Sequence, residues 1–316
     1  MKTKRSARPP AVLTINRFGL CDLLDRNGFR AIPWPEDAFD LAAFLQREGP
    51  QIAALVTTGP VPLPAGLLEV ANNLTLICCL GAGYECYDPS ALAARGIRLT
   101  NAASVNAEDV ADLAICLLLA ARRRLVEADQ SIRVGQWPRV LMTSRNRGRK
   151  LGILGLGAIG RAVASRAQSL GMNVGWHGPT KKKSSWPYLP DVLELATWAD
   201  DLVIACRATP LNKNVVGEEV LGALGGDGIL INVARGSLVD ESALIASLKS
   251  GRIAAAGLDV FAYEPTDPST WEGVPNVTLY PHAGGATHEA LEDGKAVVLE
   301  NLRRHFACEP LLTPLN

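Results

Sequence analysis

Short apolar runs alternate with helical patterns along almost the whole chain of 316 residues. We expect strands over 11–16, 52–57, 74–80, 97–100, 150–154, 173–177, 202–206, 229–233, 254–258 and 277–280. Helical patterns lie between most of them, for example over 41–48, 65–71 and 158–170. Such alternation is typical of βαβ units that build a parallel sheet. Because this is more strands than one sheet usually holds, we predict an α/β fold with two Rossmann-like or flavodoxin-like domains, each with a parallel sheet, and a cleft between them.

A long helical pattern over 106–124 indicates where the two domains divide. Asn106 suits the N-cap of this helix, and the basic residues 122–124 suit its last turn. The last helical pattern, 287–306, follows the final strand and is expected to pack back on the first domain. We therefore predict one domain from 1–100 together with 287–316, and the other from 101–286.

The charges balance: Lys plus Arg is 32, Asp plus Glu is 32, and the formal net charge is zero. A general nucleic-acid binder or a polybasic membrane-surface protein usually needs a basic excess, so we expect neither partner. The longest apolar run, 113–121, is far shorter than the roughly 20 residues that span a bilayer. No apolar stretch of a secretory signal follows the basic start, so we expect a cytoplasmic protein. The seven cysteines include no C-x-x-C spacing, so no metal site is expected.

The segment 155–160 reads Gly-Leu-Gly-Ala-Ile-Gly and lies between an apolar strand pattern and a helical pattern. This is the G-x-G-x-x-G motif in the strand–turn–helix context that dinucleotide binding requires. Gly155 permits the tight turn, Gly157 lets a pyrophosphate approach the backbone, and Gly160 lets helix and strand pack closely. The alternative is a purely structural turn. We predict a dinucleotide cofactor, with its phosphates on the exposed N–H groups of the helix.

The strand that follows the motif indicates which dinucleotide is bound. An Asp or Glu about 20 residues on would bind a free ribose 2′-hydroxyl, but the segment 174–183 contains no acid. Thr180, Lys181 and Lys182 stand there instead, and cationic donors favour a 2′-phosphate. The alternative is a solvated basic turn. On this charge argument we expect NADP(H) to be preferred over NAD(H).

Seven motifs carry a family resemblance. They are Gly81-Ala82-Gly83-Tyr84, the segment 105–112, Gly135-Gln136-Trp137, the glycine motif, the segment 231–236, the segment 257–261 with Glu264-Pro265, and the segment 281–287. With these motifs the chain resembles the D-isomer-specific 2-hydroxyacid dehydrogenase family. Within it, the ending 310–314 and the acid-free turn resemble the NADPH-dependent glyoxylate/hydroxypyruvate and hydroxyphenylpyruvate reductases. The resemblance implies that the first domain binds substrate and the second binds the dinucleotide.

The resemblance also implies a catalytic triad of Arg235, Glu264 and His282. Reducing a 2-oxo acid needs a cation for the carboxylate, which the planar guanidinium of Arg235 can supply. It also needs a proton as the hydride arrives, which His282 can donate near neutral pH. Glu264 would pair with His282 and favour its protonated form. Taken singly, the three could be a surface ion-pair partner, a solvated turn residue and a capped loop histidine. Together, an Arg, a Glu and a His that match the family's triad and stand at the ends of successive strands favour the catalytic interpretation.

By the same resemblance, Ala82 and Gly83 would offer backbone N–H groups to the substrate carboxylate, and Thr57 and Thr58 would line the same site. Besides the three glycines and the basic turn, the expected cofactor contacts are Ala158, Ile159, Gly178, Cys206, Arg207, Asn212, Val233, Ala234, Asp259 and Gly284. Asp259 could instead be a structural acid at a strand end, and Arg207 could instead point to solvent. Pro179 stands where NADP-binding relatives often carry Arg, so the NADP(H) preference depends on Thr180 and the lysines that follow it.

The leading hypothesis is an NADPH-dependent reductase of a small 2-oxo acid such as glyoxylate or hydroxypyruvate, which yields the D-2-hydroxy acid. One alternative is an NAD-dependent D-2-hydroxyacid dehydrogenase with another substrate. Another is a nucleotide-sensing, corepressor-like binding protein, which would need little from the triad. The resemblance further implies a homodimer that forms through the long helical pattern after residue 101.

Overall fold

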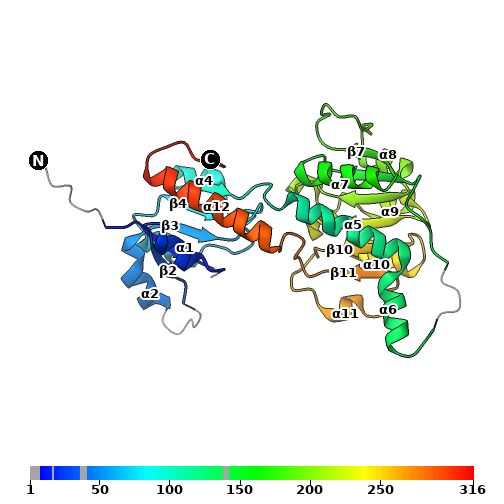
Figure 1. The fold of residues 1–316 in the computed structure, drawn as a ribbon, viewed down its shortest axis with the longest axis horizontal. Coiled ribbons are helices and arrows are strands. Elements are labelled where there is room, and N and C mark those ends of the chain that lie inside the picture. The colour runs from blue at the N-terminus through cyan, green and yellow to red at the C-terminus, as the bar shows by residue number, and fades with distance from the viewer. Residues whose placement is uncertain (1–7, 16–17, 36–40, 138–141) are drawn as a thin grey trace, which may run out of the picture. The chain divides into compact units, whose positions relative to one another are not determined.

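The structure, a computed structural model, describes residues 8–15, 18–35, 41–137 and 142–316 (Figure 1). The chain divides into two compact units. Unit 1 comprises Met1–Asn106 and Thr287–Asn316, and unit 2 comprises Ala107–Ala286. Each unit has one parallel β-sheet with helices packed on it, so the predicted α/β class with two parallel sheets is confirmed.

Unit 1 has a five-stranded parallel sheet in the order β2-β1-β3-β4-β5. Its strands are β1 (Ala11–Thr14), β2 (Arg30–Pro33), β3 (Ile52–Thr57), β4 (Leu76–Cys79) and β5 (Arg98–Asn101). Its helices are α1 (Leu20–Arg26), α2 (Leu41–Glu48), α3 (Leu67–Val70), α4 (Pro89–Ala94) and α12 (His288–Phe306). The order is that of flavodoxin-like sheets. The last residue of the first predicted strand, Asn16, lies outside the described residues.

The sequence analysis missed one element of unit 1, strand β2, and predicted another, helix α12. The sequence analysis missed β2, because this short edge strand has only one buried side chain, Ile32, and therefore lacks an apolar period. Helix α12 was predicted, and its N-terminus has a side-chain cap. The Thr287 hydroxyl accepts the Ala290 N–H at 3.0 Å. Val298 and Leu302 of this helix are buried among side chains of β1, β3 and β4, which fixes the helix on the sheet of unit 1.

Unit 2 has a six-stranded parallel sheet in the order β11-β10-β9-β8-β6-β7. Its strands are β6 (Lys150–Leu154), β7 (Asn173–His177), β8 (Asp201–Ile204), β9 (Ile229–Asn232), β10 (Ala255–Leu258) and β11 (Val277–Leu279). Its helices are α5 (Ala107–Arg123), α6 (Leu125–Arg133), α7 (Ala158–Ser169), α8 (Val192–Trp198), α9 (Glu218–Leu224), α10 (Glu241–Lys249) and α11 (Pro268–Trp271).

Helices cover both faces of this second sheet, which explains why its strands are apolar at nearly every position. In β9, Ile229 and Ile231 join one core with α5 and α7. Leu230, between them in sequence, joins the other core with α8, α9 and α10. Successive side chains of a strand point to opposite faces, so a strand buried on both faces must be apolar throughout.

The strand order reverses at β6, which has β7 on one side and β8 on the other. In an open α/β sheet, ligands bind outside the carboxyl ends of the strands at such a reversal. The glycine motif follows β6 directly, so the fold places it at this point of the sheet. None of the helices in the described part of the chain is both long and apolar enough to cross a membrane.

Candidate active site

The predicted cofactor residues and the predicted triad all lie at one edge of the unit 2 sheet, where its parallel strands end. The glycine motif follows β6, Gly178 follows β7 and Cys206 follows β8. Arg235 follows β9, Asp259 follows β10, and His282 lies three residues after β11. Because all six strands run the same way, segments far apart in the sequence meet at this edge.

His282 and Glu264 are in contact. Their Nδ1 and Oε2 atoms are 2.5 Å apart, and both side chains are about one-third exposed. The second oxygen of Glu264, Oε1, accepts the Phe261 N–H at 3.0 Å, which fixes the carboxylate on its own loop. With Nδ1 turned to the carboxylate, Nε2 is the imidazole atom left to face a substrate. This arrangement can orient the ring for proton transfer.

The buried carboxylate of Asp259 holds the loop that carries His282 through hydrogen bonds to its backbone. This carboxylate is 3% exposed and accepts the N–H groups of Ala283 and Gly284 at 2.8 and 3.0 Å. Burial raises the pKa of Asp259, and the two hydrogen bonds oppose that rise. His282 itself has a φ of 51°, in the left-handed region, and donates its N–H to the Tyr280 carbonyl at 3.0 Å. Asp259 therefore stabilises the loop of His282 through these two hydrogen bonds. The cofactor contact predicted for Asp259 stays a prediction.

Arg235 lies in the loop after β9, and Asp259 follows the neighbouring strand β10. The buried Asn232 side chain accepts the Ala234 N–H and donates to the Arg235 carbonyl, both at 3.0 Å. The Arg235 guanidinium is half-buried and donates to the Ala234 carbonyl at 2.6 Å. A Cβ atom on Gly236 would lie 1.9 Å from the Phe261 carbonyl oxygen. Glycine is therefore required where this loop touches the loop of Glu264.

The glycine motif has the geometry that a dinucleotide needs. Gly155 has a φ of 102°, and a Cβ there would meet the Cys206 backbone at 2.5 Å. A Cβ on Gly160 would lie 2.0 Å from the Gly155 carbonyl, so α7 packs tightly on the loop. A Cβ on Gly157, by contrast, would meet nothing within 4 Å. The open side of the loop lies at the N-terminus of α7, beside Ala158 and Ile159, where a pyrophosphate is expected to bind. The residues present fit a dinucleotide.

The basic turn after β7 is anchored by an aromatic side chain. The Tyr188 hydroxyl donates to the carbonyl of the buried Gly178 at 3.1 Å, and its ring lies 4.9 Å from that of Trp176. The Lys181 ammonium lies 5.9 Å from the centre of the Tyr188 ring. Lys182 reaches in another direction, and its ammonium donates to the Leu156 carbonyl at 3.2 Å. The turn and the glycine motif are therefore joined by one lysine side chain.

The loop after β8 is closed by Asn212. Its amide donates to the Arg207 carbonyl at 2.9 Å, and its carbonyl oxygen accepts the Thr209 N–H at 2.7 Å. Arg207 is exposed. Cys206 is packed against Gly155, and burial raises the pKa of its thiol to about 11. The Cys206 side chain therefore packs against the glycine motif, and its thiol is protonated at neutral pH.

The four residues predicted to touch substrate come together in unit 1. Thr57 ends β3 and Thr58 follows it. The next residue, Gly59, is so close to Gly83 that a Cβ on it would lie 2.3 Å from the Gly83 backbone. The Ala82 carbonyl accepts the Asn101 amide at 2.7 Å, which fixes the loop. The Thr57 side chain is buried, and its hydroxyl accepts from Tyr87 at 3.2 Å. Thr58, Ala82 and Gly83 are more exposed than Thr57.

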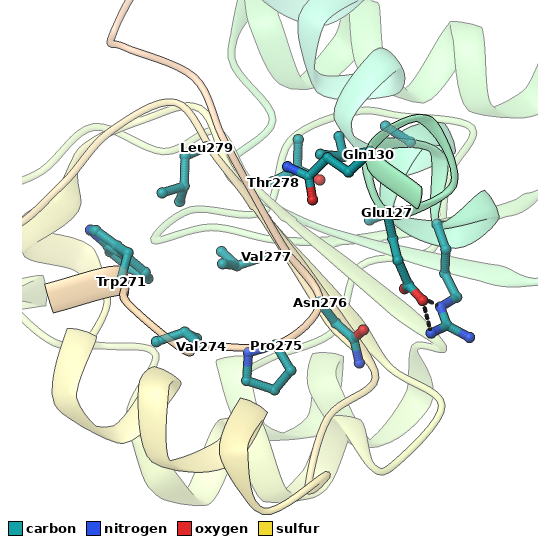
Figure 2. Close-up of a pocket in the computed structure, with 13 residues that line it drawn as sticks. Glu127, Gln130, Trp271, Val274, Pro275, Asn276, Val277, Thr278 and Leu279 are labelled. Atoms are coloured by element: carbon teal, nitrogen blue, oxygen red, sulfur yellow. Dashed lines mark hydrogen bonds and ion pairs between the residues drawn. The ribbon is translucent and has the colours of Figure 1, made fainter. Parts of the chain in front are cut away.

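A cavity of about 550 Å³ lies elsewhere in unit 2, between α6 and the edge strand β11 (Figure 2). Gln130 and Glu127 of α6 line it, and Glu127 pairs with Arg124 at 2.5 Å. None of the predicted site residues lines this cavity. Among the described residues, no three His, Cys, Asp or Glu side chains gather in a way that could hold a metal ion.

Sequence reasoning missed four residues that position the site. Asn232 and Gly236 stand inside motifs that the sequence displays, so their types were visible although their contacts were not. Phe261 also stands inside a motif, so its type was visible although its contact with Glu264 was not. Tyr188 had no signal in the sequence, because its contact with Gly178 depends on how the loop after β7 folds.

Comparison with known proteins shows the family to which the chain belongs. The model of the D-isomer specific 2-hydroxyacid dehydrogenase, NAD binding domain, matches residues 115–284. A glyoxylate/hydroxypyruvate reductase of Arabidopsis thaliana is 36% identical over 317 residues, which cover 98% of each chain. The chain therefore belongs to the D-isomer specific 2-hydroxyacid dehydrogenase family. It is an NAD(P)-dependent D-2-hydroxyacid dehydrogenase or reductase.

Solved structures show the same fold. A 2-hydroxyacid dehydrogenase from Ketogulonicigenium vulgare has a TM-score of 0.89 and 35% identity, and the match covers 98% of this chain and 99% of that one. An NADPH-dependent glyoxylate/hydroxypyruvate reductase from Sinorhizobium meliloti, solved with NADP and malonate, has a TM-score of 0.85 and 34% identity, covering 98% and 97%.

Proposed function

We propose that this protein reduces a small 2-oxo acid, of the glyoxylate or hydroxypyruvate type, to the D-2-hydroxy acid with NADPH. The observation that carries the proposal is the His282–Glu264 pair, with Arg235 in the loop two strands away in the same sheet and the glycine motif at the same edge. The names of the similar reductases from Arabidopsis thaliana and Sinorhizobium meliloti support the substrate class.

Each residue has a defined task in this proposal. The bound cofactor supplies the hydride. Arg235 binds the substrate carboxylate and orients the carbonyl, and its fork of donors matches a carboxylate. His282 gives a proton from Nε2 to the carbonyl oxygen as negative charge develops there. Glu264 holds Nδ1, which fixes the orientation of the ring for the transfer. Ala82 and Gly83 offer backbone N–H groups to the carboxylate.

The first prediction concerns cofactor and substrate. We expect kcat/KM to be higher with NADPH than with NADH, and higher for glyoxylate or hydroxypyruvate than for pyruvate or phenylpyruvate. The measurement is initial-rate kinetics with all four acids and both cofactors. An efficiency with NADH equal to or above that with NADPH would contradict the cofactor preference. Turnover of the bulky phenylpyruvate above that of the two small acids would contradict the substrate class.

The second prediction concerns assembly. The sequence analysis placed a homodimer interface on the long helical pattern that forms α5, and this helix has ten buried residues. We propose a homodimer that forms instead through the face of the next helix, α6. This helix has no buried residue. Leu125 and Ile132, two turns apart on one side of it, are 60% and 53% exposed. Contiguous exposed apolar side chains of this kind mark protein interfaces. We expect a dimer in sedimentation velocity, and a monomer when Leu125→Asp and Ile132→Asp are combined. Leu312→Asp, at an exposed position of unit 1, is the matched control and should stay dimeric. A monomeric wild-type protein would disprove the proposal.

A further inference from the structure

We infer that, of the three lysines in the basic turn, Lys182 selects the cofactor's 2′-phosphate, and that Tyr188 is the positioning residue that holds the turn for it. The inference deepens the proposed function and rests on its NADPH preference. The sequence presents Lys181, Lys182 and Lys183 as equals, because all three follow the strand end and carry the same charge.

The structure distinguishes Lys182 from Lys181 by what their ammonium groups contact. The Lys182 Nζ lies 3.2 Å from the carbonyl oxygen of Leu156, the residue between Gly155 and Gly157. Its side chain therefore crosses from the turn after β7 to the loop that is expected to hold the pyrophosphate. In dinucleotide folds the ribose that bears the 2′-substituent lies between these two segments. Lys182 thus places a positive charge where a 2′-phosphate would be.

An ammonium group has three N–H donors, and the contact with Leu156 uses one of them. Within the described residues, no ion pair joins Lys182 to a carboxylate, so its charge is not neutralised by the protein. A group fixed by one hydrogen bond with donors remaining loses little conformational freedom when a phosphate binds. This makes Lys182 a pre-positioned phosphate ligand.

Lys181 points to a different neighbour. Its ammonium lies 5.9 Å from the centre of the Tyr188 ring, an arrangement in which the ring face attracts the charge. The same ring is stacked on His177 at 5.9 Å, and its hydroxyl donates to the Gly178 carbonyl. Lys181 and Tyr188 therefore stabilise the turn together, and Tyr188 fixes the backbone from which Lys182 extends.

The test compares two nucleotide fragments that differ only in the 2′-phosphate: 2′,5′-ADP and 5′-AMP. Binding of each is measured by isothermal titration calorimetry to the wild-type protein and to Lys182→Ala, Lys181→Ala and Lys183→Ala. A hydrogen bond between charged groups corresponds to a factor of about 10 to 100 in affinity. We expect Lys182→Ala to weaken 2′,5′-ADP by that factor and to leave 5′-AMP within about threefold. Lys183→Ala is the matched control and should change the ratio of the two affinities by less than about threefold. Lys181→Ala, which removes the contact with the Tyr188 ring, should change this ratio less than Lys182→Ala does.

Steady-state kinetics gives the second readout. Lys182→Ala should raise KM for NADPH and leave KM for NADH and kcat close to the wild-type values. Tyr188→Phe keeps the ring but removes its hydrogen bond to Gly178. We expect it to weaken 2′,5′-ADP more than 5′-AMP, whereas a merely structural role would weaken both alike. An equal effect on both fragments would overturn the positioning role of Tyr188.

The outcomes separate this inference from the proposed function. If the wild-type protein binds 2′,5′-ADP no better than 5′-AMP, the NADPH preference itself is wrong. If the wild-type protein discriminates and Lys182→Ala still discriminates, while Lys181→Ala or Lys183→Ala does not, the NADPH preference stands and the assignment to Lys182 is overturned.

Discussion

Replacing His282 by Gln should lower kcat for the reduction of a 2-oxo acid by about 10²- to 10⁴-fold, the usual contribution of a general acid. The imidazole touches the Glu264 carboxylate through Nδ1, so its other nitrogen is the group available to protonate a carbonyl oxygen. Glutamine has a similar size and can keep a hydrogen bond to Glu264, but its amide does not act as an acid near neutral pH.

The measurement is single-turnover reduction followed by the loss of NADPH absorbance, with cofactor affinity measured separately by fluorescence titration. Cofactor affinity should stay within about twofold of wild type, because His282 is assigned to substrate chemistry. His288→Gln is the matched control: this histidine is exposed at the start of α12, and its variant should retain wild-type kcat. A His282→Gln variant with unchanged turnover would show that another group supplies the proton.

Replacing Asp201 by Asn should destabilise unit 2 by about 3–5 kcal/mol, the usual cost of leaving one partner of a buried ion pair alone. Asp201 starts β8, is fully buried, and pairs with Arg122 of α5 and, at 3.3 Å, with Arg149. Arg122 is itself buried and donates to the Asp227 carbonyl at 3.1 Å. Burial raises the pKa of Asp201 and lowers that of Arg122, so both charges depend on each other.

The effect is best measured as the loss of Tm in a calorimetric scan, where about 3–5 kcal/mol corresponds to roughly 6–20 °C for a unit of this size. The double variant Arg122→Met with Asp201→Leu should lose less Tm than Asp201→Asn alone. It removes the more deeply buried guanidinium together with its carboxylate and leaves only the more exposed Arg149 without this partner. Asp112→Asn, in an exposed pair with Arg166, should shift Tm by less than about 2 °C. An equal loss in Asp112→Asn and Asp201→Asn would contradict the argument from burial.

Most of the fold could be predicted because its signals are local. Strands β8, β9 and β10 of the unit 2 sheet are buried along their whole length, so each appears as a nearly continuous apolar run that needs no knowledge of its neighbours. Strand β2 could not be found this way. It lies at a sheet edge with one buried side chain, and its pairing with β1 rather than its own sequence defines it.

In the candidate site, too, the roles of some residues could be predicted from sequence, and those of others depend on the tertiary structure. Gly155, Gly157 and Gly160 show their roles in sequence, because only glycine permits the turn and the close contacts that the motif needs. Glu264 and His282 are 18 residues apart, in the loops after the neighbouring strands β10 and β11. The resemblance named the pair, but only the fold brings the two atoms together. Asp259 was left open between a cofactor contact and a structural role, and its two backbone hydrogen bonds show the structural contact.

The sequence by itself determined the chain's class, the edge of the sheet where chemistry can occur, and the residue types that stand there. These follow from periodicity and from the common direction of parallel strands, which are local properties of the chain. The tertiary structure alone decided which neighbour each charge has. Arg122 suits the end of a helix in sequence, yet it is buried against Asp201. Lys181 and Lys182 look equivalent in sequence but have different contacts. The physical reason is that the energy of a charge depends on its burial and partners, which come from segments distant in the chain.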